Sequence, residues 1–215
     1  QSTRPGAEII TEAIEIERVV PLIEAIHAAM PNMPISIDTY HATVAKAAID
    51  AGASIVNDIS CGNFDSKMIS TVVANQVGYI GMHQTGNPST MHEVQNRSDI
   101  IKTMIDYFNE KKKQFAAIGL TQWIIDPGFG FSKNQNQNFE IVKNFDLLHI
   151  LNVPILVGVS RKSIIYKTLE IDPKTSLNGT SAMHAFLLAK NASIFRVHDV
   201  HEMNEVKKLW ELSFC

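Results

Sequence analysis

The sequence predicts an α/β fold with a parallel sheet, and three observations support that prediction. Six short runs of apolar and β-branched residues recur along the 215 residues, and segments with helical periodicity separate them. The runs are apolar almost throughout, which is typical of parallel strands that are buried on both faces. A polar or ionisable residue follows each run. Strict alternation of strand and helix therefore indicates a parallel sheet covered by helices.

The predicted strands are residues 34–37, 54–57, 77–82, 123–125, 155–159 and 193–197. Two architectures fit this order, an open doubly wound sheet and a closed eight-stranded barrel. Two further βα units of roughly 30 residues each would bring the chain near the ~250 residues of a barrel. We therefore predict one (β/α)8 TIM-barrel domain over residues 1–215, with about six βα units in this chain and two strands expected before it.

Three helical segments show an apolar face with steps of three and four residues. The first has Ala13, Ile16, Val19, Val20, Ile23, Ile26 and Met30, and begins about ten residues into the chain. A second has Ile101, Met104, Ile105, Phe108 and Phe115, and Ser98 is its predicted N-cap. The last has Met203, Val206 and Trp210.

Composition argues against several classes of partner. The formal net charge of −3 argues against a general nucleic-acid binder, because such proteins are usually basic. No stretch approaches 18 uninterrupted apolar residues, so we expect no membrane span. Two cysteines, Cys61 and Cys215, without a CxxC motif suit a reducing compartment, so a cytoplasmic protein is expected.

The polar residues after the strands form the main functional signal. In a barrel the active site collects at the C-terminal ends of the strands. In chain order these ends carry Asp38-Thr39, Asn57-Asp58, Met82-His83, residues 126–131, residues 158–163 and residues 196–199. Asp38 alone could be only a helix cap, and Asn57-Asp58 alone could be only turn chemistry. Their clustering at every strand end favours a site.

Two of these segments favour ligand binding more than structure. Gly128 and Gly130 alternate with phenylalanines, which is costly unless the backbone must bend around a ligand. Arg196 and His198 are two residues apart on a strand, so both point to the same face. Charged side chains that share one face at a barrel mouth rarely serve stability.

Together these residue types point to two kinds of ligand group. Carboxylates and an amide accept or share hydrogen bonds in fixed directions, which suits a flat heterocycle with an N–H and amino edge. Lys162, Arg4, Arg196 and His198 supply positive charge for a phosphate or pyrophosphate. The residues alone do not identify the heterocycle.

Seven segments in one order resemble the dihydropteroate synthase family, and the resemblance covers essentially the whole chain. They are residues 2–6 (STRPG), 35–39 (ISIDT), 55–58 (IVND), 82–88 (MHQTGNP), 126–131 (DPGFGF), 158–162 (GVSRK) and 196–199 (RVHD). The family joins 6-hydroxymethyl-7,8-dihydropterin pyrophosphate to p-aminobenzoate and releases pyrophosphate, and sulfonamides compete for the p-aminobenzoate site. A homodimer is implied as well.

The resemblance implies a role for each matching residue. Pterin binding is expected of Asp38, Asn57, Met82, Asp126, Gly158 and Lys162. Pyrophosphate binding is expected of Arg4, Arg196 and His198, and p-aminobenzoate binding of Thr3, Phe131, Ser160 and Lys162. Asp126, Lys162 and Arg196 are the expected catalytic residues. Mg2+ is the expected cofactor, and its family ligand, an asparagine, would lie in the two strands expected before residue 1.

Three alternative functions fit part of the pattern. A methyltransferase acting on methyltetrahydrofolate would share the pterin carboxylates, but it needs no group to hold pyrophosphate. A non-catalytic pterin-binding relative should have lost some of the charged residues at the mouth of the barrel. The charged residues expected within this chain are all present. A Schiff-base aldolase would use Lys162 as a nucleophile, and borohydride should then trap it with a carbonyl substrate.

Overall fold

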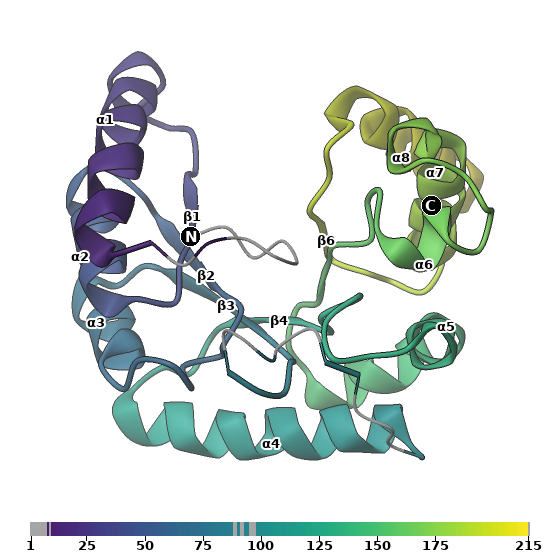
Figure 1. Ribbon diagram of the computed structural model, residues 1–215, viewed down its shortest axis with the longest axis horizontal. Coiled ribbons are helices and arrows are strands. Elements are labelled where there is room, and N and C mark those ends of the chain that lie inside the picture. The colour runs from purple at the N-terminus through teal and green to yellow at the C-terminus, as the bar shows by residue number, and fades with distance from the viewer. Residues whose placement is uncertain (1–7, 9, 88–89, 91–92, 95–97, 215) are drawn as a thin grey trace. The chain divides into compact units, whose positions relative to one another are not determined.

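The computed structural model describes residues 8, 10–87, 90, 93–94 and 98–214. The described residues form six strands: β1 (Ser36–Asp38), β2 (Ile55–Asp58), β3 (Gly78–Met82), β4 (Ile124–Asp126), β5 (Leu156–Val157) and β6 (Ile194–Phe195). The α-helices are α1 (Glu12–Ala29), α2 (Ala42–Asp50), α3 (Met68–Asn75), α4 (Ile100–Ile118), α5 (Gln135–Lys143), α6 (Ser163–Tyr166), α7 (Leu177–Leu188) and α8 (Val200–Phe214). Each strand is followed by a helix (Figure 1), which confirms the six predicted βα units.

The chain forms two compact units. The first contains the described residues up to Met82 together with Glu110–Ile124, and the second contains His83–Asn109 and the chain from Ile125 onward. The single domain over residues 1–215 stays a prediction.

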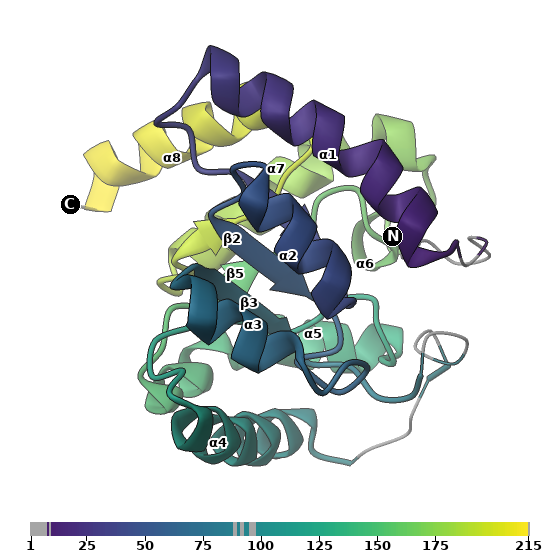
Figure 2. The same ribbon diagram turned by 90° about the vertical axis from the view of Figure 1, so that its left-hand side faces the viewer.

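A parallel sheet forms the centre of the first unit. Ser36 pairs with Ile55, and Ile55 pairs with Gly78, so β1, β2 and β3 run side by side in sequence order. Helices α1, α2 and α3 cover one face of these strands, as Figures 1 and 2 show from two directions. Because the strands are parallel, Asp38, Asn57 and Met82 all stand at the same edge.

The core of the first unit combines aliphatic and aromatic side chains. Val44, Val56 and Val72 are fully buried between sheet and helices. Phe115 packs edge-on against Tyr79 and Trp123, with ring centroids 5.7 and 4.9 Å away. Such contacts stabilise the pairs beyond simple burial, and they anchor Tyr79 in a defined position.

Parallel pairing also organises the second unit. Leu156 of β5 pairs with Ile194 of β6, and Ile125 of β4 bridges to Ile155. Strands β5 and β6 are shorter than predicted, with two residues each. The chain leaves the ladder at Gly158 and after Arg196, whose N–H still donates to the Val157 carbonyl. The residues that were predicted to extend β5 and β6 instead form the loops that carry the predicted site residues.

The predicted helix faces are largely correct. The apolar residues predicted for α4 are buried or partly buried, and so are those of α1 except Ala13 and Met30, which are exposed. The predicted cap of α4 is wrong by one residue. Asp99, not Ser98, accepts from the Lys102 N–H through its carboxylate. A carboxylate at a helix N-terminus also interacts favourably with the positive end of the helix dipole.

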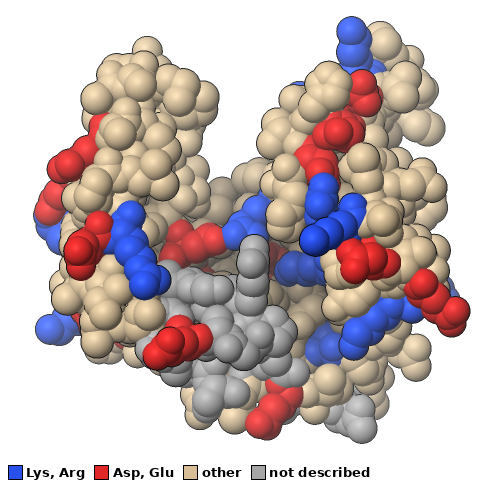
Figure 3. Space-filling model, turned by 45° about the horizontal axis from the view of Figure 1, so that its top comes forward, with Lys and Arg blue, Asp and Glu red and all other residues tan. Residues whose placement is uncertain are grey.

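Among the described residues, no helix is long and apolar enough to cross a membrane. On the face drawn in Figure 3, Lys and Arg side chains are interspersed with Asp and Glu over most of the surface. This distribution agrees with the small net charge of −3.

Candidate functional site

In the first unit, an amide and a carboxylate meet at the edge where β1 and β2 end. The Asn57 side-chain nitrogen donates to Asp38 Oδ1, which fixes the orientation of the amide. The Asn57 side-chain oxygen is buried and accepts no hydrogen bond from the described residues. A buried acceptor without a donor is costly unless a ligand supplies one. Met82, at the end of β3, is buried beside the same edge.

The neighbouring Asp58 has a different role. This fully buried carboxylate accepts from the Ser60 N–H and hydroxyl, from the Gly62 N–H and from the Tyr79 hydroxyl. Burial raises the pKa of Asp58, and these hydrogen bonds oppose the rise. Its acceptor positions are occupied by the protein itself, so Asp58 is a structural residue.

In the second unit, Asp126 ends β4 as a buried carboxylate among cations. Among the described residues its carboxylate accepts one hydrogen bond, from the Gly128 N–H at 2.7 Å. Burial raises the pKa of Asp126, and Lys162, the Gly128 N–H, Lys133 and Arg196 oppose the rise in that order. A buried carboxylate with spare acceptor positions is a candidate to bind a ligand that carries N–H groups.

The loop after Asp126 is built around a buried lysine. Lys133 Nζ donates to the carbonyl oxygens of His83, Gly128 and Phe131 at 3.0–3.1 Å. Gly128 and Gly130 have φ of +70° and +79°, a conformation that glycine adopts without strain. Lys133 therefore fixes the turn that presents Asp126 and Phe131, and sequence reasoning missed it.

Lys162 stands on the loop after β5, and its side chain reaches the loop after β4. Its ammonium donates to the Phe129 carbonyl at 2.7 Å and lies 4.9 Å from the centre of the Phe131 ring. Gly158 faces the same group, because a Cβ there would stand 3.8 Å from Lys162 Nζ and 4.0 Å from Asp126 Oδ2. The structure thus brings Asp126, Phe131, Gly158 and Lys162 together, as the sequence predicted.

The loops after β5 and β6 present the remaining predicted residues. Ser160 is buried, and its hydroxyl accepts from the His198 N–H and contacts His198 Nδ1 at 3.0 Å. Arg196 and His198 are exposed to solvent. An exposed guanidinium and an exposed imidazole on one loop are suited to bind an anionic group. Arg161, between Ser160 and Lys162, forms an ion pair with Asp199 that the sequence did not predict.

Not every predicted residue can be placed. Thr3 and Arg4 lie outside the described residues. His83 is buried and packs edge-on against Tyr107 and Phe108. The described residues contain no group of three or more His, Cys, Asp or Glu that could hold a metal ion. These residues alone therefore do not form a magnesium site.

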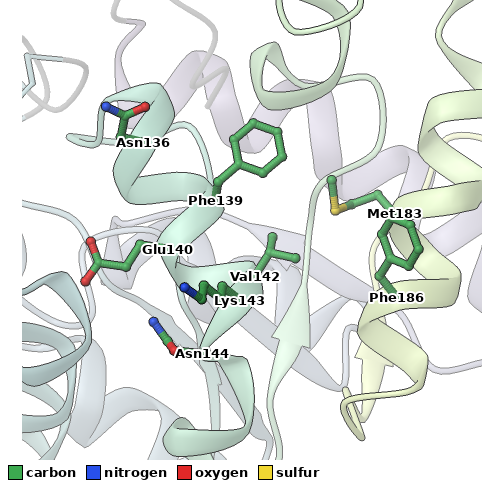
Figure 4. Close-up of a pocket in the computed structure, with 8 residues that line it drawn as sticks. All are labelled: Asn136, Phe139, Glu140, Val142, Lys143, Asn144, Met183 and Phe186. Atoms are coloured by element: carbon green, nitrogen blue, oxygen red, sulfur yellow. The ribbon is translucent and has the colours of Figure 1, made fainter.

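A separate surface groove lies between α5 and α7. Phe139 and Val142 of α5 point toward Met183 and Phe186 of α7 (Figure 4), and polar residues of α5 form its rim. None of its lining residues is a predicted site residue.

Comparisons with known proteins identify the family. The model of the family described as pterin binding enzyme matches residues 1–198. The chain is 40% identical to a dihydropteroate synthase of Synechocystis over 212 residues, which cover 97% of this chain and 73% of that protein.

Two solved structures are closely similar to this chain. The dihydropteroate synthase of Yersinia pestis, solved with a sulfonamide drug complex, superposes with a TM-score of 0.94 at 31% identity, covering 99% of this chain and 78% of that one. That of Clostridium difficile, solved in the presence of pteroic acid, superposes with a TM-score of 0.93 at 32% identity, covering 100% and 80%. The predicted fold class is confirmed, and this chain belongs to the dihydropteroate synthases of the pterin-binding enzyme family.

Proposed function

We propose that this chain catalyses dihydropteroate synthesis, the transfer of a pterin-methyl group from 6-hydroxymethyl-7,8-dihydropterin pyrophosphate to p-aminobenzoate. The observation that carries the proposal is the environment of Asp126. This carboxylate is buried, has one hydrogen bond from the described residues and is surrounded by the positive charges of Lys162, Lys133 and Arg196. Family membership over almost the whole chain supports the same reaction.

Pterin recognition is proposed for residues of each unit taken by itself. In the first unit, Asp38, Asn57 and Met82 stand at one sheet edge, and the unsatisfied Asn57 oxygen is suited to accept from a ring N–H. In the second unit, Asp126 accepts from the pyrimidine edge, Lys162 donates to it, and Gly158 leaves room for the ring.

Binding of the leaving pyrophosphate is assigned to Arg196, His198 and Arg4. Arg196 and His198 are exposed on the loop after β6, where an anion can reach them. A guanidinium can bind a phosphate group through two parallel hydrogen bonds. These residues stabilise charge that develops as the leaving group departs, which is where binding energy accelerates a reaction.

The p-aminobenzoate site is assigned to Thr3, Phe131, Ser160 and Lys162. Phe131 offers a ring face, and the ammonium of Lys162 lies 4.9 Å from its centre. The same residues would contact sulfonamides, which resemble p-aminobenzoate in shape and charge. The Yersinia pestis relative was solved with a sulfonamide drug complex, which supports sulfonamide binding by this chain.

The proposed mechanism needs no strong base. The bond between the pterin methylene carbon and the pyrophosphate oxygen breaks first, and the pterin electrons stabilise the cationic methylene. The arylamine nitrogen then forms the C–N bond and loses a proton. Lys162 binds rather than acting as a Schiff-base nucleophile, because its ammonium is already held by the Phe129 carbonyl and the Phe131 ring.

Three further features belong to the proposal. Mg2+ would neutralise charge on the pyrophosphate when bound, although the described residues do not assemble a site for it. We place the reaction in the cytoplasm, in keeping with Cys61, which is buried and forms no disulfide within the described residues. A homodimer is supported by the exposed apolar residues of α7 and α8, among them Phe186, Leu209 and Leu212.

The test is pyrophosphate release by the purified protein with dihydropterin pyrophosphate and Mg2+, with and without p-aminobenzoate. Release that depends on p-aminobenzoate and yields dihydropteroate is the expected result. Pterin binding without release would indicate a non-catalytic relative. No pterin binding at all would contradict the proposed function.

Replacing Arg196 by Ala should weaken binding of the pyrophosphate part of the substrate and leave binding of the pterin part unchanged. We expect the affinity for dihydropterin pyrophosphate to fall about tenfold or more, because one charged hydrogen bond contributes roughly 1.5–3 kcal/mol. The affinity for 6-hydroxymethylpterin, which lacks pyrophosphate, should change little. Isothermal titration of both ligands checks this, and equal losses would remove Arg196 from the pyrophosphate site.

A further inference from the structure

Two side-chain contacts join the loop after β5 to the loop after β6. In the first, the Ser160 hydroxyl accepts from the His198 N–H at 3.2 Å and contacts His198 Nδ1. In the second, the Arg161 guanidinium donates to both carboxylate oxygens of Asp199, from Nε at 3.0 Å and from Nη2. A two-point ion pair of this kind fixes direction as well as distance. The loop that carries the exposed Arg196 and His198 is therefore held at both His198 and Asp199.

The backbone at Arg161 is also constrained. Its φ is +54°, a left-handed conformation that residues with a side chain seldom adopt. Such a conformation persists where the surroundings enforce it. Here the Arg161 N–H donates to the hydroxyl of Thr180, a buried residue of α7, and the ion pair with Asp199 holds the side chain. This turn directs the next residue, Lys162, toward the Phe129 carbonyl.

The ion pair has an electrostatic consequence for an anionic ligand. Asp199 follows His198 directly and is three residues from Arg196, so a bare carboxylate there would repel a phosphate. The hydrogen bonds from Arg161 lower the pKa of Asp199, which therefore stays ionised. They also neutralise its charge at short range. With the pair intact, the positive charge of Arg196 is not opposed by Asp199.

We propose that Arg161 and Asp199 are positioning residues for the pyrophosphate end of the substrate. Arg161 cancels the negative charge of Asp199 and ties the loop after β6 to the loop after β5. The cations on one loop and Lys162 on the other are thereby kept in one geometry. The inference rests on the proposed function, because it assumes that the anionic ligand is the pyrophosphate of the pterin substrate.

The experiment compares three variants of the full protein. Arg161→Gln removes the guanidinium charge and leaves Asp199 unpaired, whereas Arg161→Gln with Asp199→Asn removes both charges. Lys190→Gln is the matched control, because it breaks a comparable ion pair, with Asp146, that involves no proposed site residue. Isothermal titration measures the affinity for dihydropterin pyrophosphate and for 6-hydroxymethylpterin, and urea unfolding measures the stability of each variant.

Arg161→Gln is expected to lower the affinity for dihydropterin pyrophosphate about tenfold or more. The affinity for 6-hydroxymethylpterin should change less than about twofold. The double variant should bind dihydropterin pyrophosphate more tightly than Arg161→Gln, because the unpaired carboxylate is gone. A merely structural role would make the double variant equally weak or weaker. Lys190→Gln should bind both ligands like the wild type.

The proposal is overturned if Arg161→Gln binds dihydropterin pyrophosphate like the wild type, or if both ligands weaken equally. It is also overturned if the second substitution recovers no affinity. A wild type that binds neither ligand would instead refute the proposed function, and with it this inference. A wild type that forms dihydropteroate, combined with any overturning result, would refute the positioning role alone.

Discussion

Asp58 and Asp126 are both buried carboxylates that end a parallel strand, yet their surroundings differ. Asp58 accepts four hydrogen bonds from neutral groups of its own unit. Asp126 accepts one from the described residues of its unit, and lysine and arginine charges surround it. Burial raises the pKa of both groups, so the direction of that shift does not tell them apart. Spare acceptor capacity, rather than burial, therefore distinguishes Asp126, the carboxylate proposed to bind a ligand, from Asp58.

The largest effect should come from Asp126→Asn. An amide offers one acceptor and one donor where the pterin edge needs two acceptors, so we expect pterin affinity to fall about 100-fold or more. Stability at neutral pH should be unchanged or higher, because burial raises the pKa of Asp126 and thus makes the ionised form costly there. Titration with a pterin ligand and urea unfolding check both statements. Unchanged pterin affinity would refute the assignment.

Asp58→Asn should show the opposite pattern. Replacing one carboxylate oxygen by an amino group leaves buried donors unsatisfied, at about 1–3 kcal/mol for each, so we expect a loss of about 3 kcal/mol in the free energy of unfolding. Pterin affinity of the folded fraction should stay near that of the wild type. A variant of wild-type stability that no longer binds pterin would contradict the structural role of Asp58 and indicate that it binds the ligand.

Tyr79→Phe serves as the graded control for Asp58. It removes one of the four donors, the hydroxyl 2.8 Å from Asp58 Oδ2, and keeps the ring in its aromatic cluster. A loss of about 1 kcal/mol is expected from one hydrogen bond. A loss as large as that of Asp58→Asn would contradict the view that the four donors share the stabilisation of Asp58.

Lys133→Met should weaken pterin binding, because Lys133 fixes the turn that presents Asp126, and it should also change the pH dependence of that binding. Lys133 is one of the charges that lower the pKa of Asp126, so its removal raises that pKa further. Because the pterin needs the ionised carboxylate, binding should fail at a higher pH than in the wild type as the solution is acidified. Affinity measured from pH 8 downward tests this, with the exposed Lys174→Met as the charge control. A midpoint that stays in place or moves to lower pH would contradict the role of Lys133.

Much of the architecture and part of the site followed from the sequence. The six strands lie where apolar runs predicted them, because burial on both faces leaves a local pattern. Asp38, Asn57, Asp126, Gly158 and Arg196 stand at or directly after strand ends, as predicted. The α4 cap was misplaced by one residue, since Ser98 and Asp99 are both good capping residues and only local geometry chooses between them.

The sequence by itself therefore determined the alternation of strands and helices and the residue types at the strand ends, because both depend on neighbours along the chain. Only the tertiary structure decided which carboxylate is satisfied and which is not. Ser60 and Gly62 are local partners of Asp58, but Tyr79 lies 21 residues away, and other contacts that shape the site are as distant: Lys133 lies 50 residues from His83, and Asp199 lies 38 from Arg161. Hydrogen bonds and ion pairs of this kind form only when folding brings such groups within about 3 Å of each other, and no local pattern encodes that distance.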